Sequence, residues 1–142
     1  MSTAYQNILP IEFPNIPSAG VYYFNTKSGL RYEVRFGRLQ DNILHANIVF
    51  GVINDEFEGE EYVATNRGEV YQVMNTIVEI VKNYMQEHPK VSVYEFNAVG
   101  KDDEDENVEN ARMVLYKRFL PRIFDRQWKF KIEGNFALVT KV

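Results

Sequence analysis

The chain has 142 residues, a length that fits one domain with a substantial core. Hydrophobic residues make up 45%, charged residues 25% and aromatic residues 14% of the chain, which is typical of a globular protein and argues against a disordered one. The formal net charge of -4 predicts no broad attraction to nucleic acid or to anionic lipid. The absence of cysteine excludes disulfides, thiolate nucleophiles and thiolate zinc sites, and it fits a reducing compartment such as the cytoplasm.

The N-terminal part of the chain is rich in proline, with Pro10, Pro14 and Pro17 before Gly20. Proline cannot donate to a strand ladder and restricts the residue before it, so we predict an extended arm over residues 1–20 rather than a regular element. The apolar side chains of the arm would be costly to leave in water, so we expect them to lie across the domain or against another chain. No basic start and no long apolar run is present, so we expect neither a signal peptide nor a membrane span.

Three strand-like segments follow the arm, over residues 21–26, 30–39 and 43–53, with turn residues between them. Their short connections predict an antiparallel meander. The second segment alternates strictly, which predicts one buried face (Leu30, Tyr32, Val34, Phe36) and one wet face (Arg31, Glu33, Arg35, Gly37). An acidic loop over residues 54–61 and a short fourth strand over residues 62–65 are expected next.

The clearest helix signal lies between Asn66 and Pro89, where apolar residues recur at steps of three and four. Asn66 with Glu69 resembles a capping box, and Pro89 marks the far end. Residues 91–99 then predict an interior strand, since apolar side chains fall on both of its faces.

An acidic segment over residues 101–110 precedes a second helix, where negative charge favours the exposed amide end. Pro121 is expected to end or bend this helix. A hairpin around Gly134 and Asn135 closes the chain. We therefore predict one α+β domain over residues 1–142, in which residues 21–142 form a mostly antiparallel twisted sheet of about six to seven strands with two main helices.

The motifs of common catalytic and metal sites are missing. His45 and His88 are far apart in sequence with no zinc-ligand spacing, and the acidic segment lacks the glycine and the terminal carboxylate of a calcium loop, so we expect no metal. No Gly-x-Ser-x-Gly elbow and no phosphate-binding Gly-x-x-x-x-Gly-Lys loop is present. The sequence therefore supports neither a serine hydrolase nor a nucleotide triphosphatase.

The stretch from residue 117 to residue 131 is basic and interleaved with aromatic side chains. Single-stranded nucleic acid is bound by such cations and by stacking on exposed aromatics, and the candidate residues are Arg118, Arg122, Arg126 and Lys129. The alternation of Trp128 and Phe130 with lysines is also what a half-buried strand shows. We rank nucleic-acid binding below the alternatives for this reason.

The segment NARMVLY, residues 110–116, and the order of the predicted elements resemble the GNAT acyltransferase superfamily. The resemblance implies a coenzyme A pyrophosphate held by Arg67 and Gly68 at the start of the first helix, with acetyl-CoA as cofactor. It also implies that Tyr116 protonates the departing thiolate, and Glu95 is then our candidate base. The chain departs from the family pattern where Val70 and Gln72 stand in place of small residues, because glycine there lets backbone amides approach the phosphates.

The chain also resembles small uncharacterised α+β proteins of bacteriophages and bacteria, through the segment from Thr65 to Pro89 and LYKRF, residues 115–119. Together these features favour a binding or assembly protein without catalysis, acting through a protein partner or self-association in which the N-terminal arm takes part. An origin in a bacteriophage would place it in the virion or the host cytoplasm. A divergent acyl-CoA-dependent N-acyltransferase is the second hypothesis, and a single-stranded nucleic-acid binder is the third.

Overall fold

The computed structural model describes residues 8–16, 19–52, 67–97, 111–134 and 136–142. Its elements, in chain order, are β1 (Ile11–Glu12), β2 (Val21–Asn25), β3 (Arg31–Arg38), β4 (His45–Val52), α1 (Arg67–Glu87), β5 (Val93–Asn97), α2 (Ala111–Ile123), β6 (Trp128–Glu133) and β7 (Phe136–Lys141). The expected loop at residues 54–61, the expected strand at 62–65 and the acidic segment at 101–110 lie outside the described residues.

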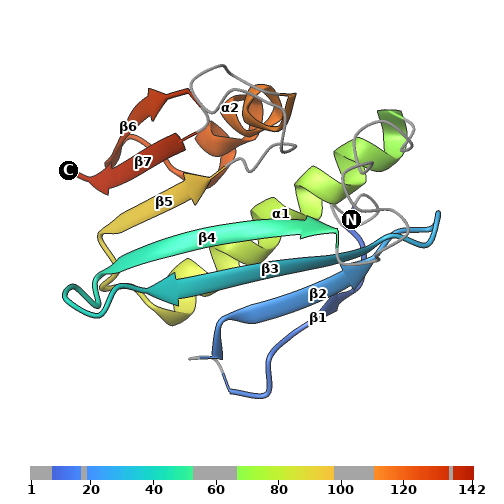
Figure 1. Ribbon diagram of the computed structural model, residues 1–142, viewed down its shortest axis with the longest axis horizontal. Coiled ribbons are helices and arrows are strands. Elements are labelled where there is room, and N and C mark those ends of the chain that lie inside the picture. Colours follow the sequence, from blue (N-terminus) through green and yellow to red (C-terminus); the bar gives the residue numbers. More distant parts are fainter. Residues whose placement is uncertain (1–7, 17–18, 53–66, 98–110, 135) are drawn as a thin grey trace.

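The strands form one seven-stranded sheet in the order β1-β2-β3-β4-β5-β7-β6 (Figure 1). Every neighbouring pair is antiparallel except β4 and β5, which run parallel because α1 carries the chain back between them. The predicted meander is confirmed in β2, β3 and β4, and the predicted interior strand is confirmed in β5. The fold is α+β, with a mostly antiparallel sheet and two helices, as the sequence predicts.

Both helices cover the same face of the sheet, which we call the helix face. Alternate side chains of the strands enter one core with α1 and α2, and the predicted buried set of β3 belongs to it. From the strands, that core takes Tyr22, Phe24, Tyr32, Val34, Phe36, Ala46, Ile48, Phe50, Tyr94, Phe96, Ala137 and Val139. From the helices, it takes Val73, Met74, Ile77, Val78, Ile80, Val81, Tyr84, Met113, Phe119 and Leu120.

The two helices are also tied to each other. Arg122 of α2 donates from Nη1 to the amide oxygen of Asn75 on α1 at 2.6 Å, and the ring of Phe119 meets that of Tyr71 edge-on. Pro121 was expected to end or bend α2; it lies inside the helix, which continues to Ile123, so it does not end it. Proline removes one helix hydrogen bond, but the burial of Phe119 and Leu120 before it and Phe124 after it holds the last turn in place.

Two glycines with positive φ lie in turns that lead into strands, one before β2 and one between β6 and β7. Gly20, at the start of β2, has φ of 66°, and a side-chain carbon there would lie 2.9 Å from the backbone oxygen of Phe36. Its own carbonyl accepts the Phe36 N–H at 2.8 Å. Gly134 has φ of 55° between β6 and β7, as the predicted hairpin requires.

Part of the N-terminal segment packs on its own domain. Leu9 is buried, and its backbone N–H donates to Oγ1 of Thr76 on α1 at 2.9 Å. Ile11 and Glu12 pair with β2, so these two residues form a short strand where we predicted none. Phe13 is 56% exposed and Ile16 is also exposed.

Among the described residues, no helix combines the length and hydropathy that crossing a membrane requires.

Candidate functional site

The parallel junction of β4 and β5 lies near the middle of the sheet and is short. Its Cα pairs run from His45 with Val93 to Ile48 with Phe96. Beyond these pairs β4 continues to Val52 beside β3, whereas β5 stays paired with β7 through Asn97. The two strands therefore diverge toward their carboxyl ends, as Figure 1 shows. We call the paired part the seam.

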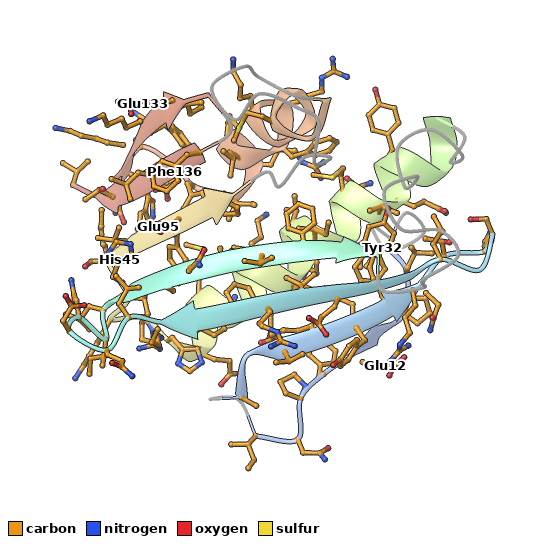
Figure 2. The ribbon with its side chains drawn as sticks, viewed as in Figure 1. Glu12, Tyr32, His45, Glu95, Glu133 and Phe136 are labelled. Carbon is orange, nitrogen blue, oxygen red and sulfur yellow. The ribbon has the colours of Figure 1, made fainter. Side chains whose placement is uncertain are left out.

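Glu95, the candidate base, lies on the seam and faces away from the helices, because its neighbours Tyr94 and Phe96 enter the core. Oε1 of Glu95 lies 2.6 Å from Nε2 of His45, and the two side chains are 22% and 16% exposed. Figure 2 shows them beside each other at the junction of the two strands. The buried Nε2 atom makes no aligned hydrogen bond, so this is a close contact of poor hydrogen-bond geometry that is an ion pair only when the imidazole is protonated.

The pairing of His45 with Glu95 is not evident from the sequence, in which His45 was tested only as a metal ligand. Two strands joined by one helix usually run parallel in the sheet. This rule predicts that β4 and β5 lie side by side, and hence that His45 and Glu95 belong to neighbouring strands. The register of the two strands, which decides whether these two side chains meet, is known only from the structure.

The sheet face that carries this pair, which we call the open face, has no described helix or strand above it. Glycine occupies it at Gly37 and Gly51, and a side-chain carbon at either position would meet no atom within 4 Å. Val49 stands between these glycines on the same face and is 39% exposed. Asn47 lies beside Glu95 across the seam.

Charged side chains of the open face are paired with one another. Glu12 meets Arg31 at 2.8 Å, Glu33 meets Arg35 at 3.0 Å, and Lys131 lies 3.5 Å from Glu133. Arg31 also lies over the ring of Tyr23, 4.6 Å from its centroid. These three pairs leave much of the described positive charge of the face set against carboxylates, and Lys129 adds a cation for which no ion pair is described.

On the helix face of the seam, Tyr94 is fully buried, and its hydroxyl has no hydrogen-bond partner among the described residues. Burial raises the pKa of this phenol, the nearby Tyr84 raises it further, and the Arg38 guanidinium acts in the opposite direction. Arg38 donates from Nε to the Tyr84 hydroxyl at 2.7 Å. The phenol of Tyr94 is thus held neutral inside the core.

The other residues of the acyltransferase hypothesis lie in the helices. Arg67 and Gly68 are the first two residues of α1, and Tyr116 lies within α2; their side chains fall outside the described part of the structure. Glu95 points to the open face, whereas α2 covers the opposite one. One ligand could reach Glu95 and α2 together only where β4 and β5 have separated.

The four cations of the nucleic-acid hypothesis are not gathered on one surface. Arg118 and Arg122 are exposed on α2, and Arg122 is held by Asn75. Arg126 lies in the turn after α2, and Lys129 projects from the open face, because its pairing partner Thr140 lies beside the buried Val139. Phe119 and Phe124 are buried and cannot stack on a base, while Phe130 is half-exposed.

No group of three or more potential metal-ligating side chains occurs within the described ranges. Comparison with known protein families finds no family model that matches the chain, and neither curated proteins nor solved structures give a match.

Proposed function

We propose that the protein is a non-catalytic binding or assembly protein that acts through protein–protein contacts, with the open face of its sheet as the binding surface. The observation that carries this proposal is the centre of that face, which no described helix or strand covers and where Gly37, Val49 and Gly51 leave the backbone of β3 and β4 approachable. Glycine inside a strand weakens it, and it is expected where another backbone or a ligand comes close. The resemblance to phage proteins adds a virion or host-cytoplasm setting to this proposal.

The character of the open face suits a protein partner better than a nucleic acid. Protein interfaces combine apolar surface with few unpaired charges, and here half-exposed apolar side chains lie among charges that are already paired. The apolar side chains are those of Val21, Tyr23, Val49, Val93, Phe136 and Leu138. A phosphate backbone needs cations that are free to neutralise it, and pairing with carboxylates opposes that.

Site-specific photo-crosslinking in the cells that produce the protein tests this surface. A photoreactive residue at Val49 should give a discrete covalent adduct with another polypeptide. The matched control places the same residue at Lys82, which is exposed on α1, and should give no discrete adduct. Equal adducts from both positions, or none from Val49, would contradict the open face as the binding surface.

A divergent acyl-CoA-dependent N-acyltransferase is the second candidate, favoured by the separation of β4 from β5 beyond Ile48 and Phe96. Glu95 directly precedes Phe96, the last residue of β5 that pairs with β4, and it could accept a proton from an amine bound beside it. Arg67 and Gly68 would then hold the pyrophosphate of acetyl-CoA, and Tyr116 would protonate the thiolate.

Ligand-dependent thermal stability separates the two candidates. A ligand at a hundredfold excess over its Kd stabilises the folded state by about 2.7 kcal/mol, so a true acyl-CoA site gives a rise in Tm that is easily measured. The binding-protein proposal predicts no rise with millimolar acetyl-CoA. The enzyme would be favoured by a rise in Tm with acetyl-CoA in both the wild-type chain and Glu95→Gln, together with acyl transfer by the wild-type chain alone.

A further inference from the structure

The strand β6 forms one edge of the sheet and pairs only with β7 in the described structure (Figure 1). It is six residues long, whereas β1 at the other edge has two residues. Unpaired backbone groups along a full-length edge strand are a template for another strand. The side chains of β6 therefore decide which strand can pair with this edge.

The side chains of β6 alternate between the two faces. The helix face carries Trp128, Phe130 and Ile132. Phe130 pairs with the buried Val139, and Ile132 pairs with the buried Ala137. Phe130 is 40% exposed, so this edge keeps an apolar side chain partly in water. On the open face β6 carries Lys129, Lys131 and Glu133, and the latter two side chains are 72% and 71% exposed.

Lysines on an edge strand exclude most partners, because pairing would place their charge beside an uncharged or like-charged side chain. A compatible strand must bring a carboxylate opposite a lysine. The strand β6 itself has this property, since Glu133 stands two residues after Lys131 on the same face.

We propose that β6 pairs antiparallel with β6 of a second copy of the chain, about a two-fold axis at Ile132. In this register Lys131 of each copy lies opposite Glu133 of the other, and Ile132 lies opposite itself on the helix face. The paired residues are 131–133 of each copy, because β6 ends at Glu133 and Gly134, with φ of 55°, turns the chain toward β7.

Neighbouring registers are less favourable. An axis at Lys131 sets that lysine against itself, and an axis at Phe130 sets Lys129 against Lys131. An axis at Glu133 sets that carboxylate against itself. Like charges directly opposite each other destabilise a strand pair, so only the axis at Ile132 gives two opposite-charge pairs and no like-charge pair.

This self-pairing rests on the proposed role in assembly and names a second copy as one partner. It joins the two sheets edge to edge, so the two open faces become one continuous surface. The pairing uses a different surface from Val49, and its test is independent of the crosslinking experiment.

Mass measured by sedimentation over a range of concentrations tests the pairing. The wild-type chain should approach twice its monomer mass of 16.6 kDa. Lys131→Glu and Glu133→Lys should each weaken the dimer by about tenfold, because each change creates two like-charge pairs. The double variant Lys131→Glu/Glu133→Lys should restore the wild-type Kd, since it exchanges the charges of both pairs.

Two controls match these substitutions. Arg35→Glu breaks the same kind of within-strand pair, with Glu33, on an interior strand, and should leave the dimer unchanged. Lys129→Glu alters an edge charge outside the proposed register and should also have no effect. A chain that stays monomeric, a double variant that fails to dimerise, or a dimer weakened by Lys129→Glu but not by Lys131→Glu would overturn the proposal. A purely monomeric chain that still crosslinks at Val49 would overturn the self-pairing alone.

Discussion

Nε2 of His45 lies 2.6 Å from Oε1 of Glu95, across the only parallel junction in the described sheet. The two side chains are mostly shielded from solvent, so their interaction is screened less than that of a surface pair. We expect the His45→Gln and Glu95→Gln variants and their combination to give a coupling free energy of about 1 kcal/mol in urea unfolding. The more exposed pair of Arg35 and Glu33 serves as control and should give a smaller coupling. Equal couplings for the two pairs would contradict the prediction.

The Tyr94→Phe variant tests whether the buried hydroxyl of Tyr94 stabilises or destabilises the fold. Because it has no hydrogen-bond partner among the described residues, Tyr94→Phe should leave the free energy of unfolding unchanged or raise it. Tyr22 donates its hydroxyl to Asn83 at 3.2 Å, so the control Tyr22→Phe should lower that free energy by about 1 kcal/mol. Urea unfolding of both variants decides the matter. A loss for Tyr94→Phe as large as that for Tyr22→Phe would mean that the Tyr94 hydroxyl has a partner.

The carboxyl of Glu12 should titrate below its ordinary pKa of 4.5, chiefly because Arg31 donates hydrogen bonds to it. A carboxyl with a lowered pKa in the folded state stabilises the fold above its unfolded-state pKa, and this contribution is lost as the pH falls through the folded-state pKa. Titration of Glu12 by NMR measures the shift. In Arg31→Gln the Glu12 pKa should return toward its ordinary value, whereas Arg35→Gln should leave it lowered. A Glu12 pKa that is ordinary in the wild-type chain would exclude the interaction in solution.

Gly20 should tolerate alanine less well than Gly29. Both have positive φ, but a Cβ at Gly20 would lie 2.9 Å from the backbone oxygen of Phe36, whereas one at Gly29 would meet nothing within 4 Å. We expect Gly29→Ala to cost about 1 kcal/mol of unfolding free energy from its backbone conformation and Gly20→Ala to cost more, because the clash adds to that strain. Chemical unfolding of the two variants measures the difference. Equal losses would show that the start of β2 can shift away from β3.

Much of the fold is predictable from local patterns. The alternation from Leu30 to Phe36 identifies both the strand and its buried face, and the three- and four-residue steps before Pro89 identify α1. These patterns work because burial on one side imposes a period of two on a strand and 3.6 on a helix. The turn at Gly134 follows from residue chemistry alone.

The missed features depend on contacts between distant segments. The meeting of His45 with Glu95 depends on the register of two strands that are separated by a helix. Pro121 remains helical because buried neighbours outweigh its local preference. Ile11 and Glu12 become a strand only because the edge of β2 is available beside them. For the candidate site, the sequence indicated Glu95 but neither its partner nor the face to which it points.

The seam divides the sheet into two parts that are each continuous in sequence, with β1 to β4 before α1 and β5 to β7 after it. In the first part each strand pairs with its sequence neighbour through a short connection. The seam must wait until α1 has brought β5 alongside β4, and the pairing of β5 with β7 likewise spans α2 and β6. We therefore expect the seam to form later in folding than the meander of β2, β3 and β4, and to open before that meander in the native state. In hydrogen exchange, the amides of residues 45–48 that bond across it should be less protected than those of β3.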